Sequence, residues 1–251
     1  MKTTRWQSVV RFLFAGLTLA TSLSLGMSTA RGELLFSDSF EYPLGSLVGQ
    51  GPPAGAPPGQ TGWSFVNGDP QVSAMGLIFP HLFSAGGGTV FLSSNFDHVV
   101  ANLTPVTSGV VWLSFLINLS SGDDGGFAVV NLGNASSPPT GYGVLDFDRL
   151  FGIDNDDLRG SVLTNIAPGA APSWLLVKLD FNTGNQTLYV NPMQSTNSPE
   201  GLVPSARLRL NPQFQAAGFF QVFLNVGQST GVWGFDEVRI GTTLADVRRG
   251  N

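Results

Sequence analysis

Asp38 is a charged residue at a position where the alternating pattern of its neighbours calls for an apolar one. It lies in a stretch, residues 34–42, that alternates like a β-strand, and it shares one face of that stretch with three apolar residues, Leu34, Phe36 and Phe40. Successive side chains of a strand point to opposite faces, so this parity predicts that the Asp38 carboxylate points toward the core.

Asp236 is in a similar position near the end of the chain. In the predicted strand around it, Asp236 shares its face with Val238 and Ile240, whereas Glu237 and Arg239 point the other way. An unpaired buried carboxylate costs several kcal/mol, so it needs a proton, a cationic partner, hydrogen bonds or a metal ion. Both aspartates are therefore candidates for a site where the first strand meets the last.

Two interpretations of this pair stay open from the residues alone. In the first, each carboxylate accepts hydrogen bonds from backbone N–H groups near the edge of the sheet. In the second, Asp236 and neighbouring carbonyl oxygens hold one calcium ion, with Asp38 as a second ligand, because calcium prefers hard oxygen ligands.

Other candidates for chemistry lack partners in the sequence. His81 and His98 lie in separate loop-like segments without the spacing of a zinc site or support for a catalytic triad, which favours ordinary surface histidines. The acidic run 154–157 offers oxygen ligands for calcium but not the spacing of an EF-hand, so a solvated turn is the simpler interpretation.

Sugar-binding proteins place aromatic rings against the apolar face of a pyranose and use amide, carboxylate and backbone groups for the hydroxyls. Four aromatic residues are candidate platforms, although core or rim packing is the simpler interpretation of each: Trp63, Tyr142, Trp174 and Trp233.

The N-terminal stretch has the pattern of a secretory signal peptide. Lys2, Arg5 and Arg11 precede an apolar run of roughly 14 residues, and small residues at 28–30 suit cleavage. A membrane anchor needs about 20 apolar residues. We therefore expect residues 1–30 to be a signal peptide, residues 31–251 to form the mature domain without a membrane span, and the product to be secreted or periplasmic.

Charge and cysteine content narrow the classes of function. The chain has 12 basic and 17 acidic residues, and three basic residues lie in the predicted leader, so the mature chain carries nine basic against seventeen acidic residues, or −8. This balance argues against nucleic acid as a partner. The chain has no cysteine, which excludes disulfides and thiolate metal sites.

The clearest local structure is a β-hairpin at residues 174–192. Leu175, Val177 and Leu179 alternate with Lys178 and Asp180, and a four-residue turn containing glycine precedes a second alternating arm. Elsewhere strand-like runs alternate with Gly, Pro, Asn and Ser clusters, which is typical of an all-β domain. Further strands are expected near 34–42, 71–75, 88–93, 110–119, 127–132, 144–153, 206–210, 219–226 and 232–240.

Two runs, 110–117 and 219–226, are apolar on both faces and indicate strands that are covered on both sides, as in a sandwich of two sheets. The Gly- and Pro-rich stretch 49–62 resembles a linker. Only about 18 residues separate it from the leader, too few for a domain, so a long surface loop is the better interpretation.

These segments together resemble a known family. The opening run 36–42, the Gly-Trp-Ser at 62–64, the Trp-Leu-Ser-Phe at 112–115, the hairpin and the closing run 235–241 are similar to exported bacterial proteins with a laminin G-like jelly roll of the concanavalin A-like lectin/glucanase superfamily. The resemblance implies an all-β, two-sheet antiparallel jelly-roll sandwich with its first and last strands close together. Calcium at the terminal strand is also known from similar glucanases.

The resemblance leaves the activity open, since one fold serves many functions. Glucanases of the superfamily carry E-x-D-x-E or E-x-D-x-x-E on one strand, and none of the four glutamates begins such a motif: Glu33, Glu41, Glu200 and Glu237. We therefore expect no catalysis and a module that binds glycan or another extracellular surface. The alternatives are a structural or adhesive protein with protein partners, and an enzyme of unrecognised type.

Overall fold

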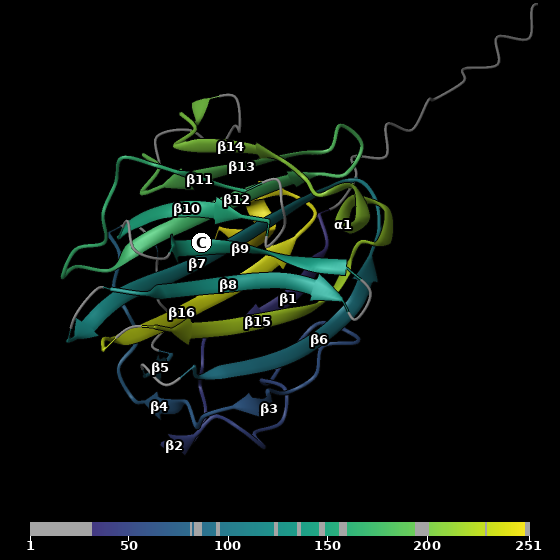
Figure 1. The fold of residues 1–251 in the computed structure, drawn as a ribbon. Helices are drawn as coiled ribbons and strands as arrows, with labels where there is room; N and C mark the ends of the chain where they lie inside the picture. Colours follow the sequence, from purple (N-terminus) through teal and green to yellow (C-terminus); the bar gives the residue numbers. More distant parts are fainter. Residues whose placement is uncertain are drawn as a thin grey trace, which may run out of the picture. The chain divides into compact units, whose positions relative to one another are not determined.

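Strands that lie far apart in the sequence pair into two antiparallel sheets in the computed structural model (Figure 1). The model describes residues 32–80, 82, 87–93, 96–122, 125–134, 137–145, 149–155, 160–193, 201–228 and 230–248. The predicted leader and His81 lie outside these residues. Within them, no helix is long and apolar enough to cross a membrane.

The larger sheet has nine strands. Their order is β14 (Ala206–Arg209), β13 (Asn185–Val190), β12 (Ser173–Asp180), β7 (Val110–Ser121), β16 (Val232–Gly241), β5 (Thr89–Leu92), β4 (Gln71–Ser73) and β2 (Gly45–Ser46), with β1 (Leu34–Asp38) also paired to β16. The pairing of the first strand with the last confirms that part of the prediction.

The second sheet has seven strands. Their order is β11 (Ser161–Leu163), β10 (Leu150–Asp154), β9 (Ser137–Leu145), β8 (Phe127–Asn134), β15 (Phe219–Gly227), β6 (His98–Val106) and β3 (Ser64–Asn67). All the pairings in both sheets are antiparallel, so the predicted fold class, an all-β sandwich of two antiparallel sheets, is confirmed.

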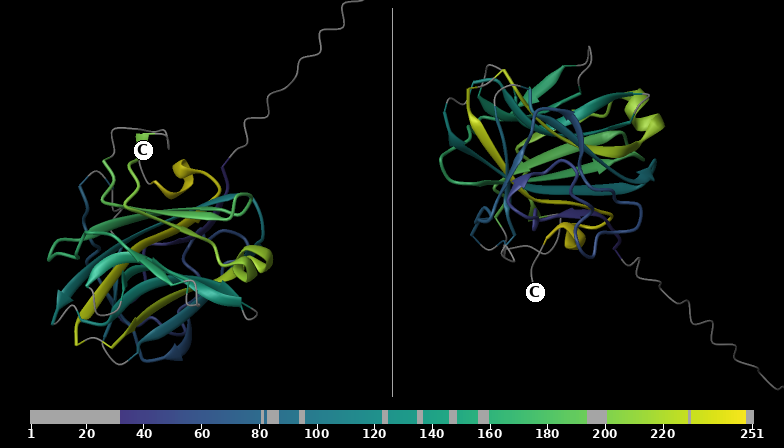
Figure 2. Two further views of the ribbon diagram at one scale, coloured as in Figure 1. Left: turned by 45° about the horizontal axis from the view of Figure 1, so that its top comes forward. Right: turned by 90° about the horizontal axis from the view of Figure 1, so that it is seen from below.

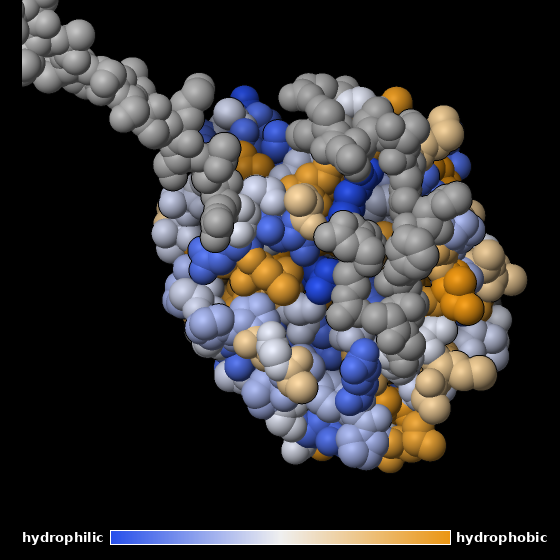
Figure 3. Space-filling model, turned by 180° about the vertical axis from the view of Figure 1, so that it is seen from behind, coloured by the Kyte–Doolittle hydropathy of each residue, from blue (hydrophilic) through white to orange (hydrophobic). Residues whose placement is uncertain are grey.

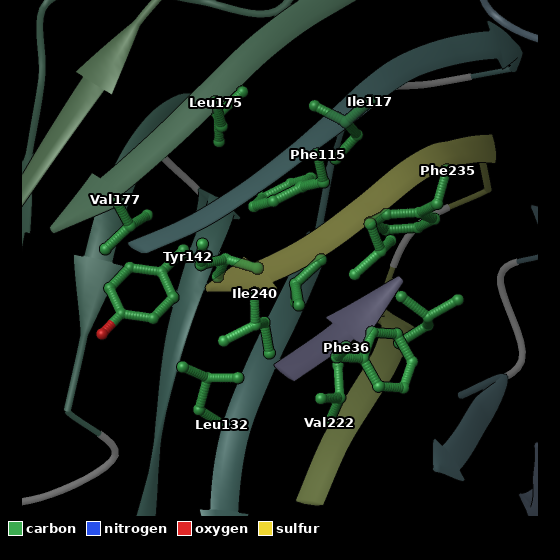
Figure 4. Close-up of a cluster of buried hydrophobic side chains, with 14 of the residues drawn as sticks. Phe36, Phe115, Ile117, Leu132, Tyr142, Leu175, Val177, Val222, Phe235 and Ile240 are labelled. Carbon is green, nitrogen blue, oxygen red and sulfur yellow. The ribbon is translucent and has the colours of Figure 1, made fainter. Parts of the chain in front are cut away.

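The main core lies between the sheets. Alternate residues of each strand supply it, as the period of two requires, and ten of its members are labelled in Figure 4: Phe36, Phe115, Ile117, Leu132, Tyr142, Leu175, Val177, Val222, Phe235 and Ile240. A short helix, α1 (Pro212–Ala217), packs beside β9 and contributes Phe214, which is fully buried. The hairpin follows its predicted pattern, since Leu175, Val177 and Leu179 all belong to this core.

A second apolar cluster covers the opposite face of the nine-stranded sheet. Trp112 and Leu116 of β7 and Trp174 and Leu176 of β12 form its floor. Leu77, Leu202 and the helix α2 (Leu244–Val247) pack over them, and Figure 2 shows α2 on this side of the sheet. Strand β7 is therefore buried on both faces, as its apolar sequence predicted. The same prediction for 219–226 was wrong, because outward residues of β15 such as Phe223 and Asn225 are only half-buried and line a groove.

Several strand predictions were wrong, and the short strands β2, β3 and β11 were not predicted at all. The predicted strand 144–153 is in fact two strands, β9 and β10, which pair as a hairpin. Strand β6 was not predicted, and it makes His98 a strand residue instead of a loop residue. Its sequence alternates, with Val99, Ala101 and Leu103 in the core, but Pro105 near its end weakened the pattern.

Candidate functional site

Asp38 points into the core, as its parity predicted. Its exposed fraction is 1%, and it lies opposite the core residue Val238 of β16. Asp38 Oδ1 accepts a hydrogen bond from Phe40 N at 2.7 Å, and Oδ2 accepts one from Tyr42 Oη and one from Trp63 Nε1, each also at 2.7 Å. Burial raises the pKa of Asp38, and the three hydrogen bonds counteract that rise.

Asp236 is fully buried, but it lies on the other face of the sheet. It pairs with Leu116, a member of the second cluster, whereas Val238 and Ile240 belong to the main core. The parity prediction for Asp236 was therefore wrong. The register along β7 shifts between Asp236 and Arg239, which marks a β-bulge that moves the following residues to the opposite face.

The bulge lies where β16 changes neighbours. Residues 233–235 pair with β5, residues 238–241 pair with β1, and Glu237 between them has a positive φ of 50°. Asp236 fills this gap with its carboxylate, which accepts hydrogen bonds from Leu77 N at 2.7 Å and from Glu237 N at 2.6 Å. Burial, and to a lesser extent the nearby charge of Glu237, raises the pKa of Asp236 to about 8.

The positions and hydrogen bonds of the two carboxylate groups do not suit a calcium ion shared by Asp38 and Asp236. The carboxylates lie on opposite faces of the sheet, and all four of their oxygens already accept N–H or O–H hydrogen bonds. No group of three or more His, Cys, Asp or Glu side chains that could hold a metal was found among the described residues. The arrangement matches the hydrogen-bonded interpretation, and the calcium interpretation is left to a test by experiment.

The candidate binding site is a groove on the outer face of the seven-stranded sheet, which faces the viewer in Figure 1. We call it the seven-strand groove; its volume is about 520 Å³. The groove is lined by outward-facing residues of six strands, β6, β8, β9, β10, β11 and β15, which alternate with the core residues of those strands. The lining residues are His98, Phe127, Val129, Asn131, Pro139, Gly141, Leu145, Asp154, Ser161, Leu163, Phe223 and Asn225, together with Gln228.

Aromatic rings lie beside amide groups in this groove. The ring centroids of His98 and Phe223 are 5.1 Å apart, and both side chains are half-buried. Asn131 lies opposite Gly141, where a Cβ atom would come within 2.9 Å of Asn131 Nδ2. The glycine therefore leaves the room that the amide occupies.

The polar groups of the groove are mostly uncharged. Asn131 Oδ1 is buried and makes no hydrogen bond within the described part of the chain. Burial lowers the pKa of His98, so its imidazole is neutral at pH 7 and offers one donor and one acceptor. Asp154 is the one carboxylate among the lining residues.

The predicted aromatic platforms are all buried: Trp63, Tyr142, Trp174 and Trp233 have exposed fractions of 2% or less. Three of them lie in the main core and Trp174 lies in the second cluster, so packing is the correct interpretation for these residues. Of the acidic run 154–157, Asp154 lines the groove, Asn155 is buried, and residues 156 and 157 lie outside the described part of the chain.

Sequence reasoning missed the aromatic residues that do line the groove. Phe127 and Phe223 lie on strands that were predicted correctly, so the outward parity of those strands was the signal that could have found them. His98 required recognition of β6, whose alternation was present in the sequence but was not used.

No protein-family model and no curated relative matches this chain. Among solved structures, it is similar to a sialidase (10% identity, 74% of this chain and 17% of that chain, TM-score 0.48). It is also similar to a glycosyl hydrolase family protein from Mycobacterium fortuitum (15% identity, 83% of this chain and 99% of that chain, TM-score 0.46). A third similar structure is the exoplasmic/lumenal domain of VIP36 in a Ca²⁺/Man3GlcNAc-bound form (7% identity, 79% of this chain and 88% of that chain, TM-score 0.45).

The chain spans about a fifth, 21%, of a bifunctional GH43-CE protein from Bacteroides eggerthii that it also resembles. Likenesses of this kind concern the general fold and carry no argument about the site. The class of protein that the strand order itself defines is an all-β sandwich of two antiparallel sheets with a groove on the outer face of the smaller sheet.

Proposed function

We propose that this chain is an exported, non-catalytic module of the concanavalin A-like jelly-roll type that binds glycan in the seven-strand groove. The observation that carries the proposal is the composition of the groove, in which half-buried aromatic rings lie next to uncharged amide groups. Sugar rings have apolar faces that pack on aromatic side chains and hydroxyl groups that pair with amides.

The buried side-chain oxygen of Asn131 favours a ligand that can donate a hydrogen bond. A buried carbonyl oxygen without a hydrogen bond costs on the order of 1–3 kcal/mol, and Asn131 Oδ1 is such an atom within the described residues. A ligand hydroxyl that donates to this oxygen would remove that cost. An apolar ligand would leave it in place, so the groove favours a ligand rich in hydroxyl groups.

The carboxylate content of the groove supports a proposal of binding without hydrolysis. Glycosidases of the common mechanism use two carboxyl groups, about 5 Å apart in retaining enzymes and farther apart in inverting ones. Asp154 is the one carboxylate among the lining residues that the structure describes, whereas this mechanism needs two. We accordingly expect no release of reducing sugar from β-glucans, even at high protein concentration.

A glycan array tests the proposal when it is combined with groove variants. We expect the purified protein to retain one or more glycans, and Phe223→Ala and Asn131→Ala each to weaken binding by about tenfold, the equivalent of roughly 1.4 kcal/mol. Phe65→Ala is the matched control, because Phe65 is 62% exposed on β3 of the same sheet and does not line the groove.

Two results would contradict the proposal. Retention of no glycan would favour the structural or adhesive alternative with a protein partner. Equal losses for Phe223→Ala and Phe65→Ala would place glycan binding outside the groove.

Export is tested separately by sequencing the N-terminus of the secreted form, which should begin near residue 31; a form that still begins at Met1 would refute it.

A further inference from the structure

A second groove lies on the outer face of the nine-stranded sheet, across β12, β13 and β14. We call it the nine-strand groove; its volume is about 570 Å³. Its charged lining residues are Lys178, Asp180, Arg207 and Arg209. Figure 3 shows the molecule from behind, the side of this sheet, with patches of strongly hydrophilic surface in its upper half.

Strand pairing places these charges in two rows. Lys178 lies opposite Thr187, which in turn lies opposite Arg207. One step along the same face, Asp180 lies opposite Asn185, and Asn185 lies opposite Arg209. Neighbouring strands are about 4.8 Å apart, so the backbones that carry Lys178 and Arg207 are roughly 10 Å apart.

Local contacts hold three of these charged groups in position. Lys178 Nζ lies 5.8 Å from the ring centroid of Trp112, within the range of a cation–π interaction. Arg209 Nη1 donates a 3.0 Å hydrogen bond to Thr183 O. Asp180 Oδ1 accepts hydrogen bonds from Asn182 N and Thr183 N, and so serves the hairpin turn.

The groove is positively charged although the chain is acidic. Three cations against one carboxylate leave a formal charge of +2, while the whole chain carries −5. No ion pair joins Lys178, Arg207 or Arg209 to an acidic side chain within the described residues, so these cations are open to an external anion. The overall charge balance, which argued against nucleic acid as a partner, therefore does not describe the charge of this face.

We propose that the nine-strand groove binds an anionic polysaccharide, with carboxylate or sulfate groups on its cations. The arginine forks match planar oxyanions, and the cations are spread over two strands whose backbones are roughly 10 Å apart. The positive charge therefore extends across the groove, which suits successive charges along a polymer. Thr183, Asn185 and Thr187 lie among the cations and offer hydroxyl and amide groups to the sugar hydroxyls.

Nucleic acid fits this groove less well. Single strands bind by stacking their bases on exposed aromatic rings, whereas Trp112 and Tyr189, which stack on each other at 6.3 Å beside Lys178, are only 3% and 6% exposed.

The test measures binding of the purified protein to polygalacturonate, dextran sulfate, neutral dextran and a single-stranded DNA at low and high salt. We expect binding to polygalacturonate or dextran sulfate but not to dextran, and weaker binding at high salt. The preferred polymer distinguishes carboxylate from sulfate. Arg207→Gln and Arg209→Gln should each weaken binding by about tenfold, since hydrogen bonds to charged groups contribute on this scale.

Arg149→Gln is the matched control, because it removes the same charge from an exposed position between β9 and β10 in the other sheet. Thermal melts of all three variants check that the fold is intact. Equal losses for Arg149→Gln and Arg207→Gln, or no binding at low salt, would overturn the proposal. DNA binding of similar strength that depends on Arg207 would overturn the assignment to polysaccharide.

Discussion

The buried carboxyl group of Asp236 should make the stability of the protein depend on pH. Burial raises its pKa to about 8, against an ordinary value of 3.8 that applies in the unfolded chain. Between these values the folded state keeps the proton and the unfolded state releases it. Unfolding is therefore favoured as the pH rises, and the free energy of unfolding should fall between about pH 4 and pH 8.

The size of the effect follows from the difference between the two pKa values. Each pKa unit corresponds to 1.36 kcal/mol, so a difference of about 4 gives an upper bound on the order of 5 kcal/mol across the whole interval. Other groups also contribute to the measured curve. The raised pKa of Asp38 acts in the same direction, and the lowered pKa of His98 acts in the opposite direction as the pH falls below about 6.5.

Asp236→Asn isolates the contribution of this one group. The amide does not ionise, and its nitrogen, unlike the hydroxyl oxygen of the protonated carboxyl group, cannot accept a hydrogen bond from Leu77 N or Glu237 N, so the variant should be about 1–3 kcal/mol less stable than the wild type near pH 4. That gap should close or reverse by pH 8, where the wild type buries a charge. Urea unfolding followed by tryptophan fluorescence, in EDTA at a series of pH values, measures it.

Asp69→Asn makes the same change at an exposed position and should give a curve parallel to that of the wild type. If the curve of Asp236→Asn is also parallel to the wild-type curve from pH 4 to pH 9, Asp236 does not titrate in this interval and the reasoning fails.

Two further predictions concern the hairpin and calcium. Leu179 is fully buried in the main core, so Leu179→Ala should cost on the order of 2–5 kcal/mol in denaturant melts, whereas Lys178→Ala should cost much less; equal losses would contradict the observed register. A calcium ion on Asp236 would raise the melting temperature in millimolar calcium relative to EDTA, and Asp236→Asn would abolish the rise. From the hydrogen-bonded carboxylates we expect no such rise, and a clear shift in the wild type would overturn that expectation.

The sequence predicted the sandwich because its strongest signals are local and periodic. The hairpin arms and β7 have long alternating or doubly apolar runs, and their pairing follows from that pattern. Strands β9 and β10 were merged into one because the sequence between Val144 and Ile153 did not show where the turn lies. The location of a turn depends on the pairing of β9 with β8, which no local pattern shows.

The candidate sites were harder to predict, because they depend on which face a residue occupies after an irregularity. One extra residue in β16 moved Asp236 to the face opposite Val238, and nothing in the sequence of that strand indicates a bulge. The bulge is explained only by the change of neighbour from β5 to β1. Strand β1 also has an irregularity, between Leu34 and Phe36, but Asp38 follows it with the same parity as Phe36, so its orientation was predicted correctly.

The pairing of β1 with β16 has a consequence for folding kinetics. It joins Phe36 to Ile240, which are 204 positions apart (240 − 36), and it lies next to the bulge that Asp236 stabilises. Contacts between such distant residues require closure of a very long loop, which slows folding. Until β16 has been synthesised, β1 has no partner in this sheet, and its hydrogen-bonding edge and Phe36 are exposed to other chains. Docking of the first strand onto the last is therefore expected to be a late step, during which the chain is most prone to aggregate.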